Sequence, residues 1–226
     1  MRRFVFLLIV GLGGAAILIS LGIWQVQRLS WKESVIADIN TRIAAEAVAL
    51  PTDLDAQRDA YLPVEVTGVL GADYLRVLVS QKQIGAGYRI IRPMQRETGN
   101  IMIDIGFVSV ADADGLRFEE GPPQRIVGNL QWPQETDGFT PEPDLNENIW
   151  FARDVDAMAR ALNTEPVLVV RREAAQLGGP VSPMPVDTRL IPNDHLQYAI
   201  TWFSLSAIWL AMTAIFLRRR SGTNKS

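Results

Sequence analysis

FVFLLIVGLGGAAILISLGIW at residues 4–24 and AITWFSLSAIWLAMTAIFL at residues 199–217 carry no charged side chain, and they bracket a more polar segment at residues 25–198. An α-helix rises about 1.5 Å per residue, so either stretch is long enough to cross a hydrocarbon layer about 30 Å thick. We therefore predict a membrane α-helical hairpin, in which two transmembrane helices flank an inserted extramembrane domain.

A cleaved signal peptide is the alternative interpretation of the first stretch, because two arginines precede its apolar run. The run is longer than the core of an ordinary signal peptide. It also ends in the bulky residues Ile23 and Trp24, where a cleavage site would need small side chains. These features favour a retained membrane anchor.

Basic residues beside the two stretches predict the orientation of the hairpin. Four of them lie in the tail at residues 218–226, whereas Arg189 alone lies close to the other end of the second stretch. Basic residues beside membrane spans favour the cytoplasmic side, and two spans return the chain to the side on which it began. We therefore expect cytoplasmic tails at residues 1–3 and 218–226 and an outer segment at 25–198, which is periplasmic if the host is a Gram-negative bacterium with the hairpin in its cytoplasmic (inner) membrane.

Composition narrows the function of the outer segment. It contains all 25 acidic residues of the chain, and six of the 22 basic residues lie in the two tails, so its net charge is about −9. Nucleic-acid binding would need a basic face, which this balance argues against. The chain has no cysteine, and this excludes disulfides, thiolate metal sites and thioether-linked haem.

The pattern of the outer segment predicts one β-rich α+β domain. Apolar residues at helical spacing extend the first helix outward as a stalk over residues 29–48, and Pro51 ends it. Runs rich in β-branched residues then predict strands separated by Gly and Asp turns, at residues 62–70, 74–80, 87–94 and 101–110. In the last run the alternating residues Ile101, Ile103, Ile105 and Phe107 are expected to share one face.

The second half of the domain mixes loop, helix and strand. A strand beginning at Arg125 leads into a loop rich in proline and glycine. Asp154 is a plausible N-cap for a short amphipathic helix that ends before Asn163. Residues 166–172 then read as a strand, and residues 178–192 read as an extended, proline-rich connection back to the membrane.

Missing residue types argue against an enzyme. The chain has one histidine and no cysteine, so multi-histidine zinc sites and Cys-His nucleophile pairs cannot be built within it. A Ser-His-Asp arrangement would have to use His195, and no G-x-S-x-G elbow or phosphate-binding loop accompanies it. The GLGG run at residues 11–14 lies inside the first apolar stretch, where close helix packing explains it better.

Each apolar stretch ends in a polar and aromatic cluster at the same predicted depth. In GIWQVQRLSWK, Trp24, Arg28 and Trp31 are spaced to share one helix face, with Gln25 beside them. An aromatic belt with snorkelling cations explains this pattern as well as a binding site does.

The cluster at the second stretch contains the only histidine. In NDHLQYAITW, Asn193 is placed to cap the incoming helix, and His195, Tyr198 and Trp202 follow at i, i+3 and i+7. A belt again explains the two aromatic residues, and a lone histidine is more often a hydrogen-bonding group than a ligand. Neutral imidazole is nevertheless the usual axial ligand of haem iron, and aromatic walls suit a porphyrin.

Both clusters resemble signatures of the Surfeit locus protein 1 family. Residues 22–32 resemble its G-x-W-Q-x-x-R-x-x-W-K motif, and residues 193–202 resemble its N-x-H-x-x-Y-x-x-T-W motif. The intermediate features agree in order, namely VTG at 66–68, FTP at 139–141 and NIWFARD at 148–154. The resemblance runs from about Gly22 to Arg218, and both terminal motifs on a two-span chain make it specific.

This resemblance implies a non-enzymatic factor for the assembly of cytochrome c oxidase, a haem-copper terminal oxidase of the respiratory chain. Bacterial members of the family are implicated in holding haem a for insertion into subunit I. The implied partners are therefore oxidase subunit I, a haem a synthase and membrane lipid, and homo-oligomer formation is left open.

The family's role carries over to particular residues. His195 becomes the axial ligand of the haem iron, with Trp24, Tyr198 and Trp202 in or near the pocket. Arg28 is assigned to the haem propionates on charge and depth. The chain departs from the family at residues 104–110, where DIGFVSV replaces an N-R-G-W-V-P-like strand. This departure bears on the partner contacts of the outer domain and leaves the membrane cluster intact.

Two other functions remain open at this point. A protein-only assembly scaffold would pack against subunit I without holding haem, through small residues of the two stretches, namely Gly11, Ala15, Ala207 and Ala211. A membrane-anchored ligand sensor would need a cytoplasmic signalling module, and the nine residues of the tail at 218–226 count against it.

Overall fold

The structure is a computed structural model that describes residues 2–81, 85–172, 179–189 and 191–223. It divides into two compact units. The first contains Met1–Asp38 and Thr188–Ser226, and the second contains Ile39–Asp187. The last three residues of the predicted basic tail, 224–226, lie outside the described part of the chain.

The first unit is a pair of long helices, α1 (Arg2–Ala44) and α4 (His195–Thr223). Their segments Val5–Ala44 and His195–Arg218 reach mean hydropathies of 2.5 and 1.8 over their most apolar windows. By length and composition both helices are able to cross a membrane. Only 17% and 6% of these windows is buried, whereas the core helix of a water-soluble protein would be mostly buried. The two predicted apolar helices are therefore confirmed.

The ends of both helices differ from the prediction. The helical stalk was expected to continue to Val48, but α1 ends at Ala44 because Val48–Ala49 forms the short strand β1, which pairs in parallel with residues 64–65. The predicted capping role of Asn193 is also wrong. The backbone carbonyl of Asp194 accepts the Tyr198 N–H at 3.2 Å, and α4 begins at His195. The capping position is therefore Asp194, one residue after Asn193.

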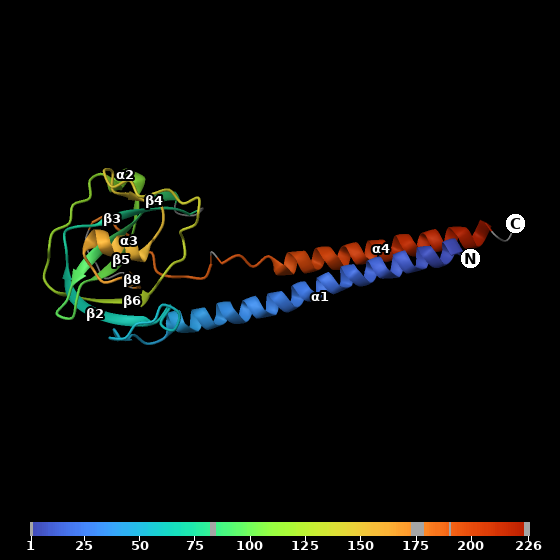
Figure 1. Ribbon diagram of the computed structural model, residues 1–226, viewed down its shortest axis with the longest axis horizontal. Helices are drawn as coiled ribbons and strands as arrows, with labels where there is room; N and C mark the ends of the chain where they lie inside the picture. Colours follow the sequence, from blue (N-terminus) through green and yellow to red (C-terminus); the bar gives the residue numbers. More distant parts are fainter. Residues whose placement is uncertain (1, 82–84, 173–178, 190, 224–226) are drawn as a thin grey trace. The chain divides into compact units, whose positions relative to one another are not determined.

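The two helices pack closely in an antiparallel arrangement, which Figure 1 shows as blue α1 beside red α4. The indole N–H of Trp209 donates to the backbone carbonyl of Gly11 at 2.9 Å. A Cβ atom at Gly14 would lie 2.6 Å from the Trp209 indole nitrogen, and one at Gly22 would lie 2.7 Å from the Phe203 ring. The glycines therefore allow close helix packing, as the GLGG run predicted.

Residues that are covered, or that contact the other helix, recur at intervals of three and four along each helix, as in a coiled coil. We call these two rows the seam. In α1 the seam comprises Leu7, Gly11, Gly14, Leu18, Gly22, Gln25 and Leu29, with the buried Ala15 beside Gly14, and in α4 it comprises His195, Ala199, Trp202, Ser206, Trp209 and Thr213. Trp209 is 40% exposed and belongs to the seam through its contacts with Gly11 and Gly14. The same face of each helix is thus used along most of its apolar length.

The second unit is a β-rich domain, as predicted. Its sheet contains β1, β2 (Pro63–Leu70), β3 (Leu75–Gln81), β4 (Gly85–Gln95), β5 (Ile101–Ser109), β6 (Gln124–Leu130), β7 (Ile149–Trp150) and β8 (Leu168–Arg171). The strand order is β1-β2-β6-β8-β5-β4-β3-β7, and β2 also pairs with β4. Five strands, β2, β6, β8, β5 and β4, therefore close into a barrel. All pairs in this circuit are antiparallel except β5 with β8.

Two apolar cores stabilise this domain. One contains Val64, Ile90, Ile103, Leu130 and Val169, which come from all five barrel strands. The other lies under helix α3 (Val155–Leu162) and includes Met102, Met158 and Leu168. Both faces of β5 are consequently buried.

The predicted N-cap of α3 and its predicted end before Asn163 are confirmed. The Asp154 carboxylate accepts the N–H of Ala157 at 2.9 Å, and Asn163 adopts the left-handed conformation at the other end. A further short helix, α2 (Val110–Ala113), was not predicted. Ser109 caps it by accepting the N–H of Asp112.

A β-bulge corrects the expected face of β5. Ile101, Ile103 and Ile105 do share one core, but the next member of that core is Val108, whereas Phe107 was predicted. The register against β4 passes from Asp104 to Gly106 and skips Ile105, so the alternation of side chains is reversed beyond this point. Gly106 has a φ of +128°, a conformation that residues with a Cβ rarely adopt.

We expect Gly106→Ala to destabilise the β-domain by at least about 2 kcal/mol, because the new Cβ would overlap the backbone carbonyl of Ser182 in addition to straining φ. Gly115→Ala is the matched control, since nothing lies within 4 Å of its added Cβ. Urea unfolding of the full-length protein, followed by hydrogen exchange in the strands, measures the change in unfolding free energy that each of the two variants causes. Equal stability of the two variants would contradict this account of the bulge.

Candidate functional site

The candidate site lies where α4 begins beside α1. The ring nitrogen Nδ1 of His195 lies 2.8 Å from the amide oxygen Oε1 of Gln25. Gln25 is buried, with 8% of its surface exposed, whereas His195 is half-buried. An amide oxygen only accepts hydrogen bonds, so Nδ1 is the donor of this contact in the tautomer that carries its proton there. In that tautomer the second nitrogen, Nε2, carries a lone pair.

Seam packing accounts for the meeting of these two residues. Gln25 follows Gly22 by three residues and precedes Leu29 by four, so it continues the row of α1 that faces α4. His195 precedes the buried Ala199 by four residues and continues the corresponding row of α4. Residues that are 170 positions apart in sequence are thereby brought into hydrogen-bonding contact.

The other predicted site residues lie around this contact with different exposures. Trp24 and Tyr198 are 54% and 55% exposed, and Trp202 is half-buried. Arg28 is exposed, and its guanidinium lies 3.8 Å from the centre of the Trp31 ring in a cation–π contact. The structure therefore pairs His195 with Gln25 and pairs Arg28 with Trp31. The ligand-binding roles of all these residues stay predictions.

Helix geometry places Trp24 and Tyr198 on one flank of the seam. Trp24 directly precedes the seam residue Gln25, and Tyr198 directly precedes the seam residue Ala199. Successive residues turn about 100° around a helix, and the sense of that turn is reversed in an antiparallel neighbour seen from the same end. Positions that precede a seam residue therefore lie on the same side of both helices.

Gln25 is the residue of this site that sequence reasoning missed as a functional side chain. Its neighbours in the W-Q-x-x-R motif drew attention as aromatic and charged groups. Its spacing from Gly22 and Leu29 could have predicted its importance, since this spacing puts the Gln25 amide in an apolar row. A buried amide in such a row needs a hydrogen-bonding partner.

A cavity of about 180 Å³ lies near the other end of the helix pair, lined by Leu7, Val10, Gly11, Trp209, Met212, Thr213 and Phe216. Its lining is almost entirely apolar, and it is smaller than the roughly 300 Å³ at which ordinary ligand pockets begin. It offers no ionisable side chain, so it carries no acid–base or metal chemistry.

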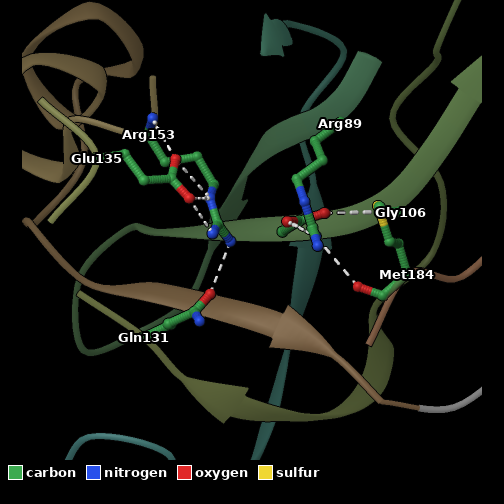
Figure 2. A network of polar contacts seen from close by, with 7 residues as sticks. Arg89, Gly106, Gln131, Glu135, Arg153 and Met184 are labelled. Atoms are coloured by element: carbon green, nitrogen blue, oxygen red, sulfur yellow. Dashed lines mark hydrogen bonds and ion pairs between the residues drawn. The ribbon is translucent and has the colours of Figure 1, made fainter. Parts of the chain in front are cut away.

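A second polar cluster lies in the β-domain, and it too was missed (Figure 2). Arg89 on β4 donates to the carboxylate of Asp104 on β5 at 2.6 Å and to the backbone carbonyl of Met184 at 3.1 Å. The other carboxylate oxygen of Asp104 accepts the N–H of Gly106 at 3.0 Å. Asp104 is fully buried.

Arg153 is at the centre of the second group of contacts in Figure 2. It donates to the Oε1 of Gln131 at 2.7 Å and forms several hydrogen bonds with the carboxylate of Glu135. Burial of Glu135 opposes its ionisation, but the hydrogen bonds and positive charge of Arg153 outweigh that effect and lower the pKa of Glu135. Each charge shown in Figure 2 thus has a partner, which identifies the cluster as a stabilising network.

Within the described ranges, no group of three or more His, Cys, Asp or Glu side chains could hold a metal ion. The arrangement at the helix boundary can instead supply a single imidazole nitrogen, beside aromatic surface, to a ligand.

Comparisons with known proteins agree with these features. The sequence model of the SURF1 family matches residues 12–207. A SURF1-like protein of Monosiga brevicollis is 33% identical over 89% of this chain and 84% of its own length. Surfeit locus protein 1 of Homo sapiens is 30% identical over 83% of this chain and 69% of its own length. A SURF1-like protein of Drosophila melanogaster is 31% identical over the same shares.

We expect Arg89→Met to destabilise the β-domain by about 3–5 kcal/mol, because it leaves the carboxylate of Asp104 buried without its cation. Arg125→Met is the control, since Arg125 pairs with Glu65 at the surface, where solvent screens the charges. Its effect on urea unfolding should lie within experimental error. Comparable losses in the two variants would show that burial of the Asp104 pair is unimportant.

The Glu135 network predicts a pH dependence of stability. Its pKa is lower in the folded state than the unfolded value of about 4.3. Ionised Glu135 therefore stabilises the fold above that value, and the contribution is lost as the pH falls through the folded pKa. Glu135→Gln should lower the unfolding free energy at pH 7 and make its decline below about pH 5 less steep. If the unfolding free energy of this variant declines below pH 5 as steeply as that of native protein, other carboxylates cause the decline.

Proposed function

This chain belongs to the SURF1 family, and from that membership we propose that it is a non-enzymatic assembly factor for cytochrome c oxidase, anchored in a bacterial cytoplasmic membrane. The proposal has α1 and α4 as the membrane anchors and the β-domain on the periplasmic side. Support comes from the antiparallel pairing of the two apolar helices, which returns the chain to the side on which it began, and from the basic residues next to both outer ends.

We further propose that the protein holds haem a, with Nε2 of His195 as the axial ligand of the iron. The observation that carries this proposal is the 2.8 Å contact between Nδ1 of His195 and Gln25, because it leaves Nε2 free to bind a metal. A neutral imidazole with its other nitrogen hydrogen-bonded is the usual form of a metal-binding histidine. The donor set thus fits a single-histidine haem site.

Close helix packing limits where a porphyrin could lie. A Cβ at Gly22 would already crowd the Phe203 ring, so the seam beside the site has no room for a macrocycle. The proposed position is the flank that Trp24 and Tyr198 share, where more than half of each side chain is exposed. Aromatic side chains there would cover the porphyrin face, and Arg28, which like Trp24 directly precedes a seam residue, would pair with a propionate.

The physical logic of a site at the membrane boundary is solubility. Haem a bound here would become a redox centre of the oxidase after its transfer to subunit I. Its long isoprenoid tail can remain in lipid while the protein holds the iron, and one histidine ligand is weak enough to permit transfer. A haem a synthase and oxidase subunit I are the proposed donor and acceptor, in contact with membrane lipid.

The alternative function is a protein-only scaffold that stabilises subunit I. Exposed small residues on α4, Ala207 and Ala211, offer a surface on which a partner helix could pack. Gly11 and Ala15 are already buried in the described structure, so they contribute less to such a surface.

We expect His195→Ala, purified from cells that make haem a, to lose most of the Soret absorbance that the native protein carries. Gln197→Ala is the control, because Gln197 is exposed in the same turn of α4. A full haem complement in His195→Ala would refute the ligand assignment. Native protein without any haem would instead favour the scaffold function.

A further inference from the structure

The strongest unassigned feature is the amide of Gln25. It is a buried polar group on an apolar helix, and such a group costs free energy unless it is hydrogen-bonded. Its partner is the chain's single histidine, on the other helix. A pair of this kind orients both side chains, since each loses its best partner if the other moves.

Three hydroxyl residues of these helices behave differently. The hydroxyl groups of Ser20, Thr201 and Thr213 each donate to the backbone carbonyl four residues earlier in their own helix. This local bond satisfies a hydroxyl without any neighbour. Gln25 and His195 bond across the pair instead, so helix solubility in lipid does not account for their contact.

We propose that Gln25 is a positioning residue, which holds His195 in the tautomer with the proton on Nδ1 and so keeps Nε2 available as a ligand. Histidine in water favours the proton on Nε2, the form that cannot bind a metal through that atom. The acceptor oxygen of Gln25 reverses this preference. The role in metal binding rests on the proposed function, whereas the tautomer does not.

The tautomer is measurable in the haem-free protein. The full chain is labelled with ¹⁵N-histidine, purified through a tag without histidine and placed in lipid nanodiscs. Because the sequence contains one histidine, both ring-nitrogen resonances belong to His195. We expect a protonated Nδ1 and an unprotonated Nε2.

Two variants and one control test the cause. Gln25→Leu removes the acceptor and should move most of the population to the Nε2-protonated form, whereas Gln25→Glu keeps an acceptor oxygen and should retain protonated Nδ1. Gln27→Leu, at an exposed position two residues along α1, should leave the spectrum unchanged. A native spectrum with the proton on Nε2 would overturn the inference, because Gln25 would then be donating its amide N–H to Nδ1. An unaltered tautomer in Gln25→Leu would overturn it as well.

Haem binding separates this inference from the proposed function. In titrations of the same nanodiscs with haem a, Gln25→Leu should bind at least about tenfold more weakly than native protein, as loss of a partner hydrogen-bonded to a ligand typically causes. Gln25→Glu should keep its affinity and show a lower reduction potential, since a carboxylate makes the imidazole a stronger donor. If native protein and His195→Ala bind haem equally, the proposed ligand role of His195 fails while the tautomer result stands. If the tautomer changes in Gln25→Leu but haem affinity does not, Gln25 has no positioning role toward the iron.

Discussion

Close approach of α1 and α4 is the contact on which the candidate site depends. Lipid tails are as apolar as the helix surfaces, so burial of apolar area gives little drive for association in a membrane, and packing and hydrogen bonds must supply it. Gly14 and Gly22 let the large rings of Trp209 and Phe203 come against the α1 backbone. This packing sets the register of the pair, and the register brings Gln25 to His195.

The two polar clusters of the protein differ in what they leave unsatisfied. In the β-domain, Arg89 and Asp104 satisfy one another, and backbone groups take up the remaining bonds. A network of that kind stabilises one arrangement of strands and offers nothing to a ligand. At the helix boundary, one nitrogen of His195 is bonded and the geometry leaves the other free. The second arrangement is therefore the one suited to binding.

Much of this fold could be predicted from sequence, because long elements carry their own signals. Apolar length marked both helices, β-branched runs marked β2 to β5, and Asp154 marked the start of α3. The errors occurred where a distant partner decides the local structure. Two-residue strands such as β1 exist only through pairing, and the bulge at Gly106 reverses an alternation that looked regular. Gln25 was overlooked for the same reason, since its significance appears only beside a residue from the opposite end of the chain.

The position of β8 within the barrel has a consequence for how this domain assembles during synthesis. Residues 168–171 come last among the strands of the described residues, yet they lie between β6 and β5 and pair with both. Until these residues join the sheet, β6 and β5 each present an open row of backbone donors and acceptors, which invites pairing with foreign chains. The nascent domain thus passes through a vulnerable interval that ends only when its final strand arrives.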